Sequence, residues 1–295
     1  MSSKHVLRSI ALVFGLTLSG AVLANPINIL WYTGGIVAGG SSISNYGTAV
    51  SDLAALAPSS PGSNTWNVTL WDSGPVPSGS FNVMVIASPE GGWSTYPTYA
   101  ALQTALTGGS VTYGNRLMLT GQDADWHYMN SPGPSAFDGP QGFLLDSINW
   151  AGSGTGMGLV ALGMTGSGTC GGPLLGLSGY GSDCNGTDNV QIPAAYTGFP
   201  INTGLTSAGL SNWGTSAHAA FFSLDLTKWT GINVDGTDSC SAAPGACYVT
   251  IVSAATGGGG IGGGGTPVPE PAELSMFGLG LLLIRLFAGL RRRMA

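Results

Sequence analysis

Residues 81–87, FNVMVIA, decide the fold of this chain. A short apolar run of this kind, without alternation, is typical of a strand buried on both faces of a parallel sheet. A similar run lies before it at 27–32 (INILWY), and an alternating one lies at 66–71. Further runs follow at 116–120 and 158–162. We therefore expect five strands in one mostly parallel sheet.

Helical patterns separate these strands. Tyr46, Val50 and Leu53 recur at helical spacing before Pro58, and further helical patterns follow over 97–106 and 143–150. Strands that alternate with helices predict an α/β fold with helices on both faces of the sheet.

The order strand–helix–strand–strand–helix–strand suggests flavodoxin-like winding. Over residues 27–162 it resembles, at the level of architecture, the domain shared by class I glutamine amidotransferases and ThuA-like proteins. That family places a nucleophilic cysteine at a tight strand-to-helix turn. The comparable turn, after Leu119, reads Thr120-Gly121-Gln122-Asp123. The resemblance therefore implies the fold without amidotransferase chemistry.

The later part of the domain is richer in Gly, Ser, Thr and Asn. We interpret residues 163–214 as a loop-rich insertion pinned by a disulfide. Apolar runs at 217–224 and 248–254 predict late strands that complete or edge the sheet.

All four cysteines lie between the two ends of the chain. An oxidising compartment favours disulfides, and closure between sequence neighbours suggests Cys170–Cys184 and Cys240–Cys247. The alternative is zinc, but the chain has no C-x-x-C pair and no histidine near the cysteines.

The first 24 residues have the three parts of a secretory signal. Lys4 and Arg8 precede a short apolar run, and small residues lead to Ala24, after which we place the cut. A membrane span is the alternative, but the run falls short of the ~20 residues that a span needs. We expect signal peptidase to release an exported domain over 25–256.

The other end predicts sorting. A Gly-rich linker at 257–267 leads to Pro269-Glu270-Pro271, an apolar stretch at 274–290 and Arg291, Arg292 and Arg293. The stretch is long enough for a single transmembrane helix, and the arginines hold its end on the cytoplasmic side.

Residues 268–295 resemble the PEP-CTERM family of sorting tails. The resemblance implies cleavage near Pro-Glu-Pro by an exosortase-like membrane protease in a Gram-negative bacterium that makes exopolysaccharide. The protein would then pass through the inner membrane to the cell surface or extracellular matrix. A retained anchor is the alternative.

Charge is scarce between these ends. Arg116 and Lys228 are the only strong bases within 25–267, against twelve aspartates and glutamates. Nucleic acid is therefore excluded as a partner, because no basic patch exists to hold phosphates.

Candidate catalytic residues follow two of the predicted strands: Glu90, and then Asp123, Asp125 and His127. Ligands of doubly wound sheets sit outside the carboxyl ends of the strands. Carboxylates and an imidazole there would suit acid–base work or a divalent metal, whereas simple Asx turns are the alternative. His218 begins an apolar run and is predicted to be a core histidine.

No cofactor is predicted. Residues 183–189 and 233–238 mix Asp, Asn and Gly as calcium loops do, but neither has the EF-hand pattern, and ordinary turns share this composition. Phosphate-binding motifs and the G-x-S-x-G elbow are absent.

Two functions remain from the sequence. The first is a non-catalytic envelope or matrix protein associated with exopolysaccharide. The second is an extracellular hydrolase of carbohydrate or amide bonds that uses Glu90, Asp123 and His127 in a strand-end crevice.

Overall fold

The computed structural model describes eight parts of the chain, all within the compact unit Asn25–Gly260. The described residues are 26–33, 43–60, 64–88, 100–130, 139–163, 177–237, 240 and 247–254. The predicted signal, linker, sorting tail and helix at 274–290 lie outside them, as do Glu90 and Cys170. No helix of the described parts is long and apolar enough to cross a membrane.

The first five strands form a parallel sheet in the order β2-β1-β3-β5-β4. Their bounds are β1 Ile27–Tyr32, β2 Trp66–Trp71, β3 Val83–Ile86, β4 Tyr113–Thr120 and β5 Met157–Ala161. β3 is fully buried. The mostly parallel α/β sheet that the sequence predicts is therefore confirmed.

The strand order departs from flavodoxin-like winding at one point. A flavodoxin-like sheet has the order 2-1-3-4-5, whereas here β5 lies between β3 and β4. The chain passes over one strand position after β3, forms β4, and then returns through α4 and α5 to fill the gap with β5. The outer side of β4 is thereby left free to pair with β10.

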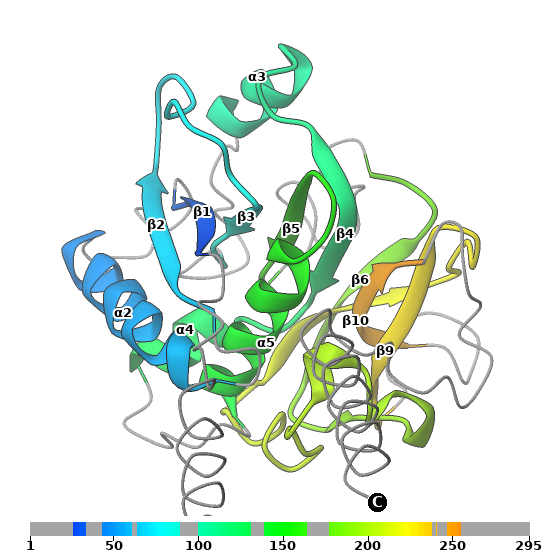
Figure 1. Cartoon of the computed structure of the whole chain (residues 1–295). Helices are drawn as coiled ribbons and strands as arrows, with labels where there is room; N and C mark the ends of the chain where they lie inside the picture. The colour runs from blue at the N-terminus through cyan, green and yellow to red at the C-terminus, as the bar shows by residue number, and fades with distance from the viewer. Residues whose placement is uncertain are drawn as a thin grey trace, which may run out of the picture. The chain divides into compact units, whose positions relative to one another are not determined.

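Helices cover both faces of this sheet (Figure 1). One face carries α2 (Ile43–Leu56), α4 (Ala124–Asn130) and α5 (Pro140–Gly152), and the other carries α3 (Ala100–Thr107). Successive strand side chains point to opposite faces. In β1, Ile29 and Trp31 accordingly pack on the α2 and α5 side, whereas Leu30 and Tyr32 pack on the α3 side.

The remaining strands extend the sheet in antiparallel fashion. β10 pairs with β4, and β8 and β6 follow, while β9 pairs with β10 and β7 with β9. Their bounds are β6 Gly181–Thr187, β7 Val190–Gln191, β8 Ala217–Phe222, β9 Trp229–Asp235 and β10 Tyr248–Ser253. Short 3-10 helices lie at Ala57–Ser59, Ala194–Tyr196 and Pro200–Asn202.

The predicted loop-rich insertion is partly sheet. Residues 181–187 and 190–191 form β6 and β7, although the first is rich in Gly, Ser and Asn. Backbone pairing with β8 and β9 sets this structure, because the local sequence has a weak preference for strand.

The predicted Cys240–Cys247 disulfide is confirmed. It joins the two ends of the segment between β9 and β10, with Cα atoms 5.8 Å apart. Both cysteines are buried and pack with Ala220 and Phe222 of β8. The Cys170–Cys184 pair stays a prediction, because Cys170 lies outside the described residues.

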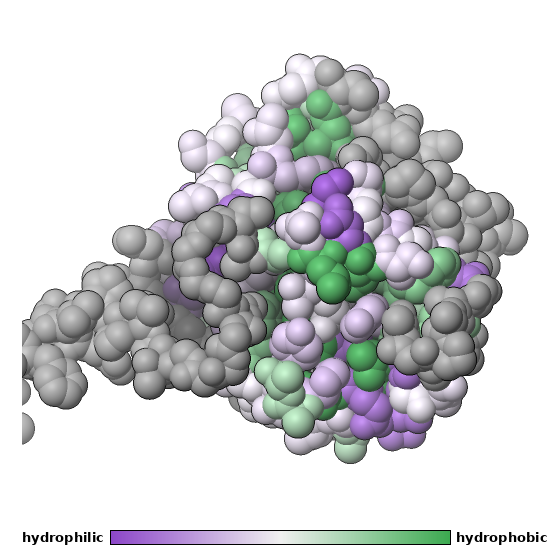
Figure 2. Space-filling view, turned by 90° about the vertical axis from the view of Figure 1, so that its right-hand side faces the viewer, coloured by the Kyte–Doolittle hydropathy of each residue, from purple (hydrophilic) through white to green (hydrophobic). Residues whose placement is uncertain are grey.

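The surface reflects the scarcity of charge. Charged residues make up 7% of the chain. Figure 2 shows the side of the molecule that is at the right in Figure 1, and most of its coloured residues are pale, with strongly hydrophilic ones in a few small groups.

Candidate functional site

Asp123 and His127 meet where β4 ends. The sequence analysis took residues 122–127 as a strand-end loop, and the structure corrects this, because Ala124–Asn130 is helix α4. Asp123 directly precedes the helix, and its carbonyl oxygen accepts a bond from the His127 amide at 3.1 Å. The first turn of α4 thus brings the side chains of Asp123 and His127 together.

His218 reaches the same place from β8. Its Nε2 lies 3.1 Å from Oδ2 of Asp123, and its side chain is 20% exposed. His218, predicted to be a core histidine, is thus a partly buried histidine whose ring is paired with Asp123. The pairing of β8 against the end of β4, invisible in the local sequence, places the imidazole beside a carboxylate.

Gly121 allows β8 to come this close. The amide of His218 donates to the Gly121 carbonyl at 2.8 Å, and the amide of Gly121 donates to Val249 at 2.9 Å. A Cβ at residue 121 would lie 2.0 Å from the carbonyl oxygen of Ala219. A glycine at this position is thus a condition for the site.

The three side chains form a compact group, the edge cluster (Asp123, His127 and His218). Their ligand-type atoms lie within 4.8 Å of one another, and no other such group occurs in the described parts of the chain. His127 Nε2 lies 3.2 Å from Oδ1 of Asp123 and 3.3 Å from the carbonyl oxygen of Thr215. Since Oδ1 has no hydrogen-bond partner, its contact with His127 is an ion pair off the hydrogen-bonding direction.

The charges within the edge cluster shift the pKa values of Asp123 and His127. Burial alone would raise the pKa of Asp123, but the contacts and charges of His127 and His218 outweigh it and lower the pKa. Burial alone would lower the pKa of His127, but the contact with Asp123 and its charge raise it. The arrangement therefore favours an ionised Asp123 facing two imidazoles.

Asp125 points elsewhere. Its Oδ2 accepts bonds from the Tyr46 hydroxyl at 2.5 Å and the Ser88 amide at 2.9 Å. Trp31 Nε1 donates to the same Tyr46 hydroxyl at 3.0 Å. Full burial raises the pKa of Asp125 despite these bonds. Asp125 thus fastens α4 to α2 and to the end of β3, and it is not a member of the edge cluster.

A strained residue lies against the edge cluster. Thr215, whose carbonyl oxygen contacts His127, has φ of 118°, a conformation that β-branched residues rarely adopt. Oδ1 of Asp188 holds it there by accepting the amides of Thr215 at 2.6 Å and Ser216 at 2.7 Å. Strain of this kind is concentrated at functional sites.

The two Asp- and Asn-rich segments are the ends of strands β6 and β9 and the short turns that follow them, where the structure describes them. Oδ1 of Asp235 accepts bonds from the Thr187 hydroxyl and from the amide and hydroxyl of Thr237. Oδ1 of Asp188 accepts the backbone amides of the turn at Thr215. These oxygens hold backbone and hydroxyl donors, as in Asx turns.

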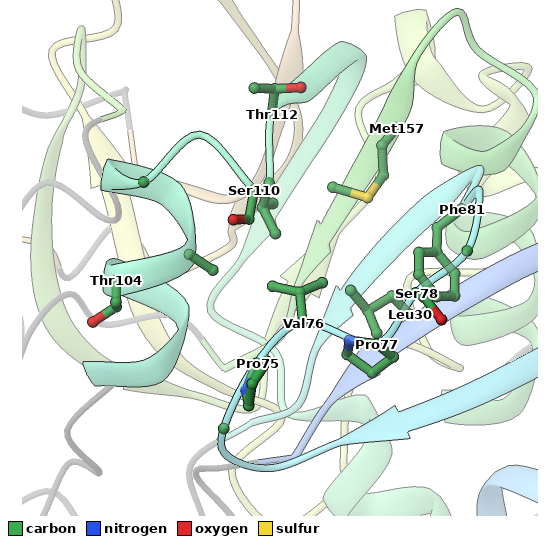
Figure 3. A pocket seen from close by; sticks show the side chains of 15 residues that line it. Leu30, Pro75, Val76, Pro77, Ser78, Phe81, Thr104, Ser110, Thr112 and Met157 are labelled. Carbon is green, nitrogen blue, oxygen red and sulfur yellow. The ribbon is translucent and has the colours of Figure 1, made fainter.

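A cleft of about 950 Å³ lies away from the edge cluster, beside the amino ends of β3, β4 and β5. Its walls come from the β2–β3 loop, α3 and the start of β5 (Figure 3). The described lining combines apolar side chains, among them Val76, Phe81 and Met157, with the hydroxyls of Ser78, Ser110 and Thr112, and it includes no ionisable side chain. Asp123, Asp125 and His127, the predicted catalytic residues that the structure describes, do not line it.

The comparisons with known proteins yield no match: no family model, no curated protein and no solved structure is similar to this chain.

The structure thus joins two of the four predicted catalytic residues, Asp123 and His127, and adds His218. Glu90 lies outside the described residues. One sequence signal pointed to His218, because His127 and His218 are the only histidines within residues 25–267.

Proposed function

We propose that the protein is an exported cell-envelope protein whose α/β domain hydrolyses an extracellular carbohydrate or amide at the edge cluster. Its signal and PEP-CTERM-like tail support export, exosortase processing and release to the cell surface or matrix. The observation that carries the hydrolytic role is the convergence of Asp123 and His127 with His218, from a distant strand, at the carboxyl end of β4.

The chemistry of the edge cluster suits the activation of water. An ionised carboxylate paired with imidazoles is a common acid–base arrangement. His218 is the most exposed member, at 20% against 12% for Asp123 and 9% for His127. Substrate would therefore approach from the side of His218, and the two more buried groups would orient the imidazole.

The second candidate is non-catalytic association with exopolysaccharide. The cleft favours it, because it offers about 950 Å³, and the residues described around it are apolar or carry hydroxyls, with no ionisable group among them. Such a lining suits binding without reaction.

One screen separates the two functions. The exported protein is incubated with neutral and acidic polysaccharides and with amide substrates, and binding and product release are measured together. Hydrolysis that His218→Ala abolishes, with binding retained, supports the hydrolase. The matched control is Asp225→Asn, an aspartate beyond the opposite end of β8. Binding that Phe81→Ala weakens, without any product, supports the second candidate and contradicts the first.

Sorting is tested separately. Replacement of Pro269 and Glu270 by Ala should leave the chain in the inner membrane with its tail attached, because the exosortase motif is lost. Immunoblotting of membrane and medium fractions measures this. An intact Arg291–Arg293 terminus on wild-type protein from its native host would contradict processing.

A further inference from the structure

We propose that Asp123, His127 and His218 bind one divalent transition-metal ion, and that zinc is this ion. The donors would be one nitrogen from each imidazole and the carboxylate of Asp123. The inference concerns binding and does not depend on whether the protein is a hydrolase.

The distances fit a single ion. Two ligands that are each ~2.1 Å from a tetrahedral zinc ion lie about 3.4 Å apart. Nε2 of His127 lies 3.2 Å from Oδ1 of Asp123, and Nε2 of His218 lies 3.1 Å from Oδ2 of the same carboxylate. All three donor atoms fall within 4.8 Å of one another. Small side-chain rotations would thus direct them at one point.

The donor types select the ion. Two imidazoles and one carboxylate are the protein ligands of many catalytic zinc sites, which keep a fourth position for water. Calcium and magnesium prefer oxygen ligands alone. The same three ligands also suit iron(II), but an exported protein works in oxidising surroundings, where zinc has no redox chemistry.

The ligands are held in place before any ion arrives. Asp123 and His127 are fixed by the first turn of α4, and Asp125 fastens that helix to Tyr46 and Ser88. His218 is fixed by the bond from its amide to Gly121. Ligands on rigid elements lose little conformational entropy when an ion binds, so ordering them reduces the affinity only slightly.

A second observation points to a ligand within the edge cluster. Asp123 as a whole residue is 8% exposed, yet its Oδ1, with Nε2 of His127 3.2 Å away, accepts no hydrogen bond. A buried carboxylate oxygen without a hydrogen-bond partner is costly, and a cation between the three side chains would satisfy it. In a metal-free edge cluster the imidazole nitrogens that face Asp123 carry protons. A metal ion takes the place of these protons, so the metal-free contact and the metal-bound cluster cannot coexist.

The test is a zinc titration of the exported protein after removal of metal with EDTA. Calorimetry with a competing chelator should give one zinc ion per chain, and cobalt(II) should give the visible absorption of a low-coordinate site. His218→Ala and Asp123→Asn should each weaken zinc binding by at least about 100-fold, since they remove a direct ligand and even outer partners cost 10–100-fold. Asp225→Asn, the matched control, should bind zinc as the wild type does.

The melting temperature of each metal-free variant shows whether the fold survives. If Asp123→Asn does not fold, the comparison rests on His218→Ala, whose ring is partly exposed. Absence of zinc binding at micromolar concentration, equal affinity in His218→Ala and wild type, or binding of calcium in place of zinc would overturn the proposal. Zinc binding without hydrolysis of any substrate would refute the proposed function alone. Hydrolysis by metal-free protein that binds no zinc would refute the metal site alone.

Discussion

The parallel half of the sheet (β1 to β5) and the antiparallel half (β6 to β10) are built on different principles. The strands of the parallel half are apolar runs covered by helices on both faces, and β3 is buried at every position. In the antiparallel half, β6 has the sequence GSDCNGT, and both the β6–β8 and β9–β10 pairings contain register shifts. Apolar runs between two layers of helices specify the first half. In the second half β8, β9 and β10 are also largely buried, and pairing with these strands specifies the weak strands β6 and β7.

The edge cluster lies where these halves join. Asp123 and His127 belong to the parallel half and His218 to the antiparallel half, while β4 and β10 form the seam through Met118–Thr120 and Thr250–Val252. The site therefore exists only if both halves are folded and correctly joined.

The largest effect is expected at the seam itself. In Gly121→Ala, the added Cβ would lie 2.0 Å from a backbone oxygen of β8. Because backbone must move, we expect a loss of about 4 kcal/mol in the free energy of unfolding, at the upper end for single substitutions. Gly198→Ala is the matched control, since a Cβ there meets no atom within 4 Å. Chemical denaturation measures both, and equal stability of the two variants would show that the halves are not joined as described.

The second largest effect concerns the parallel half alone, and it is a dependence of its stability on pH. Asp146 of α5 is 4% exposed, and burial raises its pKa to about 8. Between the unfolded value of 3.8 and about 8, only the folded state keeps the proton. The free energy of unfolding therefore falls as pH rises through this window, and above it the loss is complete.

Asp146→Asn should remove that dependence and stabilise the protein by about 4 kcal/mol at pH 7, since pH 7 lies about three units above the unfolded pKa and each unit is worth ~1.4 kcal/mol. Melting curves between pH 4 and pH 9 measure this. The exposed Asp52→Asn on α2 should change little. A wild-type stability that rises steadily from pH 4 to pH 8 would contradict the assignment.

The disulfide tests the antiparallel half. Cys240 and Cys247 close a short loop before β10. In the chain-entropy model, a loop of this length contributes about 2.5 kcal/mol. The double variant Cys240→Ser, Cys247→Ser should lose that amount in denaturant melts. Exchange protection should fall in β9 and β10 and persist in β1 and β3. Uniform loss of protection over all strands would show that the halves unfold as one unit.

The smallest effect concerns the strained turn. Thr215→Gly relieves a φ of 118° and should stabilise the protein by about 0.5–1 kcal/mol. Thr197→Gly is the control, because Thr197 has an ordinary φ of −62°, and glycine there should destabilise by a similar amount. If both variants lose stability equally, Thr215 carries no strain.

The strands of the parallel half could be predicted from the sequence better than those of the antiparallel half. The segments 27–32 and 66–71 match β1 and β2 residue for residue, because an apolar run in the first and an alternating run in the second are both strand patterns visible in the local sequence. β6 and β7 were missed, since their pairing partners, not their own side chains, make them strands. β9 was missed although it is largely buried, because its end at 233–235 mixes Asn and Asp as turns do. Asp123 and His127 were found because they follow a predicted strand. His218 could not be joined to them, because its contact depends on a pairing across 95 residues of sequence.

The most direct test of the account is the imidazole ¹⁵N spectrum of the labelled protein during a zinc titration, with signals assigned from His127→Gln and His218→Gln. We predict that the Nε2 resonances of His127 and His218 move together and stop moving at one zinc ion per chain. We also predict that Asp123→Asn abolishes both shifts, whereas Asp225→Asn keeps them. Movement of only one imidazole, or of neither, would contradict the claim that the two halves of the sheet build one metal site.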